Sequence, residues 1–393
     1  MDESTVVIAG GARTAMGGLN GAFSGVSAVE LGTAAIRAAI ERSGFAASDI
    51  DEVIMGCVLP AGVKQGPARQ ASIAAGIPKT AGATTINKLC GSGMQAIIFA
   101  HDQIRAGTNS VMVAGGMESM SSAPHLLLNS RTGYRIGHVE AKDHMFHDGL
   151  EDAYTGRLMG TFAQETANDL GFTREQMDRY AVQSLERANA AIASGALKDE
   201  IVPVTVKGRK GETVVDTDEQ PGNANPAKIP TLKPSFAKDG TITAANSSSI
   251  SDGASAIVLS SLGEAKRRGL APQARIVAHA RNSHEPALFT TAPVGAIQKV
   301  LAKAGWTKDD VELFEINEAF AMVTMAAITQ LGLDEAKVNV FGGACAQGHP
   351  IGSTGCRIVV TLMHALRRLG KTRGVAALCI GGGEATALAI ELL

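Results

Sequence analysis

Cys90 lies in a local sequence that favours nucleophilic chemistry. It lies in the segment NKLCGSGMQA, where an apolar strand predicted over 83–86 gives way to a helix through a glycine-bracketed corner. A thiol at a helix N-terminus faces free backbone N–H groups and the positive end of the helix dipole, which favour the nucleophilic thiolate. The flanking glycines leave room for a substrate carbonyl to approach the sulfur. Cys90 is therefore the predicted nucleophile.

Three further segments carry reactive side chains at similar corners. They are NEAFA with Asn317, GHPIG with His349, and CIGGG with Cys379 and Gly381. Ligands of open α/β sheets collect beyond the carboxyl ends of the strands. We therefore expect these segments to meet Cys90 in one pocket.

Two thiols, an imidazole and a carboxamide suit acyl transfer between thioesters. Cys90, activated by His349, would take an acyl group from one thioester, and Cys379 would remove an α-proton from a second to give the attacking carbanion. The N–H groups of Cys90 and Gly381 would stabilise one oxyanion. His349, with a water held by Asn317, would stabilise the other. This chemistry needs no metal or redox cofactor.

An internal duplication supplies the elements that must position these groups. Residues 44–56 (GFAASDIDEVIMG) align without gaps on 305–317 (GWTKDDVELFEIN). Each copy reads as an amphipathic helix ending in glycine, an acidic turn and an apolar strand. Later in each half a glycine corner opens a helix, and an apolar strand, 111–114 or 376–380, ends before consecutive glycines. This alternation predicts α/β halves whose parallel or mixed sheets are covered on both faces.

The predicted organisation is two similar halves, residues 1–118 and 250–393, with a loop domain, 119–249, inserted after the first. The insert contains one clear amphipathic helix over 173–195 and a stretch rich in Pro, Gly and Asn over 220–234. Its place beside the reactive corner favours a role in substrate binding and subunit contacts.

Composition restricts the classes of partner. The 393 residues carry a formal net charge of −2 without long basic runs, which argues against nucleic acid and anionic membranes as partners. Apolar stretches are interrupted well before the roughly 18 residues that a bilayer span needs. The five cysteines are scattered and odd in number, which indicates free thiols and a cytoplasmic or similarly reducing location.

The remaining cysteines and histidines give weaker indications of a functional role. Cys345 and His349 have the i, i+4 spacing of metal ligands on a helix, but Gly348 and Pro350 interrupt that segment. No metal site is therefore predicted. Cys356 and His101 lie on apolar helix faces and are interpreted as packing residues.

The four motifs NKLCGSGMQA, NEAFA, GGACAQGHPIGSTG and CIGGGEA together resemble those of the thiolase family, in the same order and over essentially the whole chain. The resemblance implies a five-layered α/β/α/β/α fold of two duplicated halves with a loop domain. It implies an acetyl-CoA C-acyltransferase, with acyl-CoA and CoA as substrates and products, no cofactor and a homotetrameric assembly. It assigns the acylated nucleophile to Cys90, the second acid/base to Cys379, the activating histidine to His349 and the water-holding asparagine to Asn317.

The resemblance also implies positions that bind the substrate. They are Leu158, Met159, Phe236, Ser248, Ala319 and Phe320. Acetoacetyl-CoA thiolases of the biosynthetic type commonly carry His-Met-Gly where this chain has Leu-Met-Gly at 158–160. Leu158 therefore leaves open a longer-chain 3-ketoacyl-CoA thiolase of fatty-acid β-oxidation. The residues proposed for the CoA nucleotide are Lys207, Arg209, Lys210 and Lys228.

Three alternatives remain open at this level. The segment GSGMQA, with Glu118 further along, satisfies the dinucleotide-binding fingerprint G-x-G-x-x-A of oxidoreductases, but that reading leaves His349 and Cys379 unexplained. A decarboxylating 3-ketoacyl synthase of the same superfamily typically has histidine in place of Cys379. A non-catalytic CoA-binding scaffold is expected to have lost Cys90, His349 or Cys379.

Overall fold

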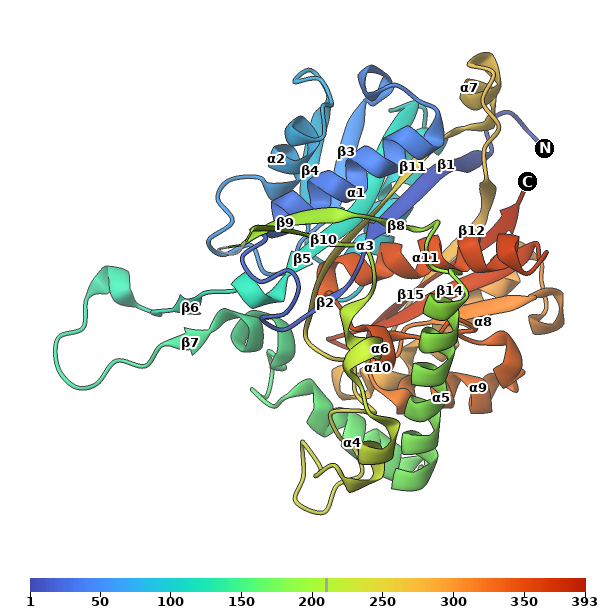
Figure 1. The fold of residues 1–393 in the computed structure, drawn as a ribbon. Coiled ribbons are helices and arrows are strands. Elements are labelled where there is room, and N and C mark those ends of the chain that lie inside the picture. Colours follow the sequence, from blue (N-terminus) through green and yellow to red (C-terminus); the bar gives the residue numbers. More distant parts are fainter. Residues whose placement is uncertain (209–210) are drawn as a thin grey trace.

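The structure, a computed structural model, describes residues 1–208 and 211–393. Two α/β halves lie side by side, and a region in green and yellow covers one end of them (Figure 1). The strands of the halves are β1 (Val6–Thr14), β2 (Gly17–Gly18), β3 (Glu52–Gly56), β4 (Gly82–Ile86), β5 (Val111–Ser119), β11 (Ser251–Ser261), β12 (Ala274–Ser283), β13 (Leu313–Ile316), β14 (Arg373–Ile380) and β15 (Glu384–Leu392). Their helices are α1 (Ala28–Ser43), α2 (Pro67–Ala74), α3 (Ser92–Arg105), α7 (Leu262–Arg267), α8 (Ala292–Ala304), α9 (Ala321–Leu331), α10 (Ala344–Gln347) and α11 (Ile351–Arg368).

The sheet order confirms the predicted duplication. The strands of the first half follow the order β4-β3-β5-β11-β1, and those of the second follow β13-β14-β15-β12. In the first half β4, β3 and β5 pair in parallel, and in the second half β13 pairs with β14 in parallel. The next pair in each half, β5 with β11 and β14 with β15, is antiparallel. Val7 and Ile8 of β1 pair with Arg275 and Ala274 of β12. The two halves are thus joined edge to edge.

Helices α3 and α11 pack against each other at the centre of the molecule (Figure 1). Their crossing is close because glycines face it. A Cβ at Gly93 would lie 2.7 Å from the backbone nitrogen of Cys356, and one at Gly355 would overlap the backbone of Met94. Since α3 begins beside Cys90 and α11 beside His349, this crossing brings the two predicted corners together.

Local sequence signals account for the outer helices. Ser27 and Glu30 form a reciprocal capping box at the start of α1, and Gly44 ends the helix with φ 78°. In the second half, Gly305 ends α8 in the same left-handed conformation, with φ 68°. The glycine-terminated helix that the sequence predicts in each half is therefore present.

In the part of the inserted region that the structure describes there are short strands and three α-helices. They are β6 (His125–Leu126), β7 (Lys142–Asp143), α4 (Met159–Asp169), α5 (Arg174–Ala193), β8 (Ile201–Val202), β9 (Val204–Gly208), β10 (Gly211–Val215) and α6 (Glu219–Asn223). Thr173 caps α5, as the predicted helix over 173–195 requires. The segment around β6 and β7 projects from the body as an arm (Figure 1). None of the described helices has the length and hydropathy needed to cross a membrane.

Two sequence-based boundaries differ from the structure. β5 continues through Gly115 and Gly116 to Ser119, because these glycines lie against the backbones of Ser255 and Gly352, where a Cβ would overlap. β11, which begins at Ser251, lies between β1 and β5. The boundary predicted at residue 250 thus falls before a strand that pairs within the first half.

Candidate active site

The corner that carries Cys90 is held in a strained backbone conformation. Leu89 has φ 47°, in the left-handed region that non-glycine residues rarely adopt. Asn87 Oδ1 accepts a hydrogen bond from Leu89 N at 2.9 Å. Ser92 Oγ accepts from Lys88 N at 2.8 Å and donates to Leu89 O at 2.7 Å. These bonds fix Cys90 at the start of α3.

The end of β14 lies against this corner. Gly91, beside Cys90, packs against the side chain of Ile380, and the backbone N–H groups of Gly381 and of Cys90 act to lower the pKa of the Cys90 thiol. Lys88, two residues before Cys90, forms an ion pair with Glu384 at the start of β15. Two of the predicted corners, one from each half, therefore meet.

Cys90 is a thiol at rest, which differs from the expectation of a helix-stabilised thiolate. Burial raises the pKa of Cys90 to about 11, although the N–H groups of Gly381 and Cys90 act in the opposite direction. The negative charge of Glu118 adds to the increase. Desolvation thus outweighs the helix terminus, and the sulfur needs a base in order to react.

Cys379, the penultimate residue of β14, lies in an apolar cluster, and the next residue, Ile380, packs against Gly91 beside Cys90. Burial raises the pKa of Cys379 well above its usual value, and the neighbouring charge of Cys90 raises it further. Two adjacent thiols in a low-dielectric site disfavour simultaneous ionisation. Both sulfurs are therefore protonated before substrate arrives.

His349 is a neutral imidazole with one nitrogen free. Its Nδ1 lies 2.6 Å from Thr354 Oγ1, and Thr354 Oγ1 donates to Pro350 O at 3.0 Å. Nδ1 must therefore carry the proton, which leaves the lone pair on Nε2. Nε2 is buried and has no hydrogen-bond partner among the described residues. Burial, with the nearby charge of Arg357, lowers the pKa of His349 to about 3.

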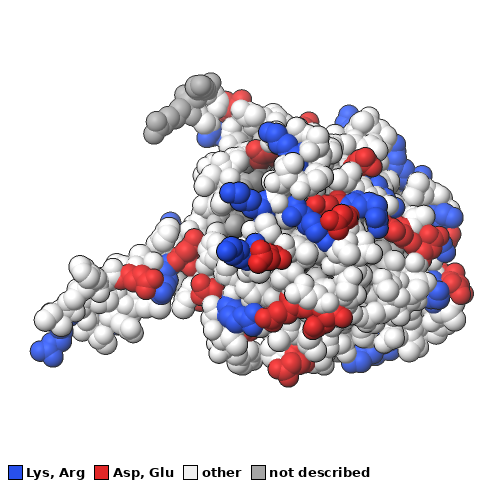
Figure 2. All heavy atoms as spheres, turned by 90° about the horizontal axis from the view of Figure 1, so that it is seen from below, with Lys and Arg blue, Asp and Glu red and all other residues white. Residues whose placement is uncertain are grey.

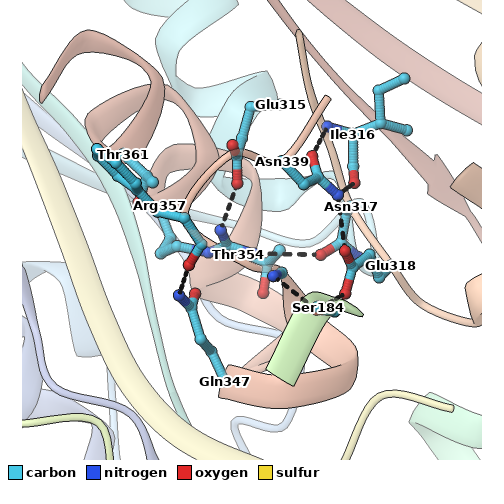
Figure 3. A network of polar contacts seen from close by, with 12 residues as sticks. Ser184, Glu315, Ile316, Asn317, Glu318, Asn339, Gln347, Thr354, Arg357 and Thr361 are labelled. Carbon is cyan, nitrogen blue, oxygen red and sulfur yellow. Dashed lines mark hydrogen bonds and ion pairs between the residues drawn. The ribbon is translucent and has the colours of Figure 1, made fainter. Parts of the chain in front are cut away.

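Asn317 is held by α11 and by the neighbouring strand (Figure 3). Its backbone N–H donates to Ala377 O at 2.9 Å, and Oδ1 accepts from Arg357 at 3.4 Å. Arg357 is fixed in turn by Glu315 at 3.0 Å. The Asn317 Nδ2 group is buried and finds no acceptor within residues 1–208 and 211–393. It is free to donate to a water or a substrate oxygen.

Glu318, the residue after Asn317, anchors this segment to the inserted region (Figure 3). Its carboxylate accepts hydrogen bonds from Tyr180 at 3.0 Å and Ser184 at 2.7 Å, both on α5. Asn339 Nδ2 donates to it at 2.9 Å. Sequence reasoning missed this residue, and its only signal was its place in the NEAFA motif.

Glu118 is a second buried carboxylate with a positioning role. It accepts backbone hydrogen bonds from Val58 at 3.0 Å, Leu59 at 3.1 Å and Gly352 at 2.9 Å. Burial raises the pKa of Glu118 to about 7. Its oxygens thus link the first turn of α11 to the segment after β3, and the buried carboxylate is out of reach of a dinucleotide ribose.

The predicted substrate positions lie mostly around Cys379. Met159, Phe236, Ala319 and Phe320 share one apolar cluster with it. The rings of Phe236 and Phe320 meet edge to face, with centroids 6.0 Å apart. Ser248 N donates to Ala319 O at 3.0 Å, so it borders the same cluster.

Other predicted residues lie elsewhere. Leu158 precedes α4 and is half-buried beside Met159. Lys207 and Lys228 are exposed in the inserted region, and Arg209 and Lys210 lie outside the described residues. His101, interpreted as a packing residue, packs its ring edge to face against His279 and also contacts Asp102.

Comparison with known proteins agrees with this geometry. The chain matches the family models for the N-terminal domain of thiolase over residues 6–262 and the C-terminal domain over residues 270–392. It is 47% identical to an acetyl-CoA acetyltransferase of Pseudomonas aeruginosa, over 98% of each chain. It is 48% identical to a mouse protein named cytosolic acetyl-CoA acetyltransferase, also over 98% of each chain.

Comparison with solved structures also finds members of this family. An acetyl-CoA acetyltransferase from Bacillus anthracis superposes with a TM-score of 0.97 at 42% identity, covering 99% of both chains. A thiolase from Ascaris suum in complex with coenzyme A superposes with a TM-score of 0.94 at 44% identity, covering 99% of this chain and 100% of that one. The predicted thiolase-like fold is confirmed, and the chain belongs to the thiolase family.

Proposed function

We propose that the protein is an acetyl-CoA C-acetyltransferase, which joins two acetyl-CoA molecules into acetoacetyl-CoA and free CoA and also catalyses the reverse thiolysis. The observation that carries this proposal is the packing of the Cys90 corner of the first half against the end of β14 in the second half, where Cys379 lies: a Cβ at Gly91 would overlap the Ile380 side chain. The printed names of the relatives support the acetyl substrate. They do not favour a longer-chain thiolase or a non-catalytic scaffold.

The first half-reaction acylates Cys90. His349 Nε2 takes the proton of the Cys90 thiol, and the sulfur attacks the thioester carbon of acetyl-CoA. The N–H groups of Cys90 and Gly381 stabilise the resulting oxyanion. As the carbon–sulfur bond to CoA breaks, the thiol of Cys379 gives its proton to the leaving CoA sulfur. The enzyme then holds an acetyl-Cys90, an imidazolium at His349 and a thiolate at Cys379.

The second half-reaction forms the carbon–carbon bond. The Cys379 thiolate removes an α-proton from a second acetyl-CoA, and the enolate oxygen accepts hydrogen bonds from His349 and from a water on Asn317. The enolate carbon attacks acetyl-Cys90, and acetoacetyl-CoA forms as the Cys90 sulfur leaves. Cys90 recovers its proton from His349, so all groups return to their resting state. These residues supply every acid, base and oxyanion donor, so we propose no cofactor.

The chain-length preference tests the acetyl assignment. We expect CoA-dependent cleavage of acetoacetyl-CoA to exceed that of longer 3-ketoacyl-CoA substrates in kcat/KM. A profile that rises with chain length would contradict the proposal.

Leu158 is the residue whose replacement should sharpen this preference. Leu158→His introduces the histidine typical of biosynthetic enzymes next to Met159, and we expect it to raise selectivity for acetoacetyl-CoA about tenfold over a six-carbon substrate. Leu158→Met, which keeps an apolar side chain, is the matched control. An unchanged profile in Leu158→His would exclude a role for this position in specificity.

We further propose a cytoplasmic homotetramer. The arm exposes apolar side chains, including Ile136, which is 97% exposed. It protrudes from a body whose acidic and basic side chains are interspersed on the face shown in Figure 2. Ile136→Asp should therefore lower the mass measured by light scattering from four chains to two. The free thiols and the cytosolic mouse relative support the location.

A further inference from the structure

A cluster of metal-ligating side chains lies where the two halves meet, away from the reactive corners. His101 and Asp102 lie near the end of α3, and His279 lies on β12. Asp102 Oδ1 is 3.0 Å from His101 Nδ1 and 2.9 Å from His279 Nε2. The two rings meet edge to face with centroids 4.9 Å apart. One ligand atom of each residue lies within 4.8 Å of the other two.

These donors match a divalent transition metal in type and spacing. Zn²⁺ binds imidazole nitrogen and carboxylate oxygen at about 2.0–2.2 Å, which places the ligand atoms of a tetrahedral site roughly 3.3–3.6 Å apart. The two contacts to Asp102 are slightly shorter than this and the three ligand atoms lie within 4.8 Å of one another, so metal binding requires a small rearrangement of the side chains. The Asp102 side chain is 52% exposed, which permits that movement and leaves a fourth position for water.

We propose that His101, Asp102 and His279 bind a divalent transition-metal ion of the Zn²⁺ class. The ligands come from both halves, so the ion would tie α3 to β12. His101 follows Cys90 by eleven positions, which is roughly 16 Å along a helix. The ion therefore touches no reacting atom and acts by stabilising the junction of the halves.

The positive charge of Lys303, close to His279, predicts how one substitution changes the affinity for the metal. Lys303 Nζ donates to the backbone oxygen of His279 at 3.1 Å. Its ammonium group repels a bound cation. Lys303→Gln is therefore expected to strengthen metal binding without altering a ligand.

Titration of the purified full-length protein with Co²⁺ tests the site, because this ion reports its ligands by absorption. We expect d–d bands of a tetrahedral site without a thiolate charge-transfer band, since no cysteine contributes. Asp102→Asn keeps the shape of the side chain and His279→Ala removes a ring; each should weaken Co²⁺ binding at least about tenfold. His138→Ala, on the exposed arm, is the control and should bind like the wild type.

Thermal unfolding with Zn²⁺ supplies an independent readout. A ligand that binds only the native state raises the melting temperature in proportion to its affinity. The wild type and His138→Ala should be stabilised by Zn²⁺, whereas His279→Ala should not. Equal Co²⁺ affinity in all variants, or binding marked by thiolate charge transfer, would overturn the proposal and would show that the three side chains form only a hydrogen-bonded cluster.

Discussion

The corners that begin α3 and α11 have the same architecture and different chemistry. In the first half, a strained turn at Leu89 presents the thiol of Cys90. In the second half, Gly348, with φ 108°, leads into His349, whose Nδ1 is held by Thr354. Duplication brought two equivalent helix starts to one place. Divergence of the side chains then gave one corner a thiol, the proposed nucleophile, and the other an imidazole, the proposed base.

The corresponding strands β5 and β14 diverged in a similar way. The last two residues of β14 are the buried thiol Cys379 and Ile380, and Gly381, the proposed oxyanion donor, follows them. β5 continues past its glycines and ends beside Glu118, which binds the backbone of Gly352 at the start of α11. The first half thus uses a carboxylate to position the second half, and the second half contributes Cys379, the proposed second acid and base.

The largest expected effect comes from removing the nucleophile of the first corner. Cys90→Ala should lower turnover at least about 10⁴-fold, because no other group forms the covalent intermediate. Mass spectrometry after incubation with acetyl-CoA should find no acetylated cysteine. Acetylation of Cys379 or Cys356 in this variant would reverse the assignment of the two halves.

Removal of the base in the second corner should have a smaller effect. We expect His349→Ala to lower kcat about 10²- to 10⁴-fold. Without the imidazole, Cys90 must ionise unaided. Since its pKa is about 11, the residual acylation rate should rise about tenfold for each pH unit between pH 7 and 9. A rate that is independent of pH over this range would show that another group activates the sulfur.

The smallest expected effect is on stability, at the crossing of α3 and α11 between the two corners. A Cβ at Gly355 overlaps the backbone of Met94, so Gly355→Ala should lower the free energy of unfolding by about 1–3 kcal/mol. Gly222→Ala is the matched control, because a Cβ there meets no described atom within 4 Å. Chemical denaturation measures both. Equal stabilities would mean that α3 and α11 separate without cost.

Much of the fold and of the site was predictable from sequence because the relevant signals are local. The duplicated helix, turn and strand and the glycine corners follow from short motifs, and the same motifs point to Cys90, His349, Cys379 and Asn317, whose roles stay predictions. The ionisation state of Cys90 was not predictable, since desolvation depends on residues that pack around it from distant segments.

The residues that position the site side chains could not be predicted from the sequence for a related reason. Arg357 and Glu318 fix Asn317 and its loop through partners far away in the sequence. The contact of His101 with His279 was not predictable either, because it joins residues from the two halves. No periodicity within one helix reports such a contact.

The central claim is that the first half supplies the nucleophile and the second half supplies the second base. It is tested most directly by incubating the Cys379→Ala variant with isotopically labelled acetyl-CoA. Peptide mass spectrometry measures acetylation of Cys90, and deuterium exchange in D₂O measures removal of the methyl proton. We predict that the label is retained on Cys90 while methyl exchange and acetoacetyl-CoA formation are lost. Methyl exchange at the wild-type rate in this variant would contradict the account, because the second half would then not supply the base.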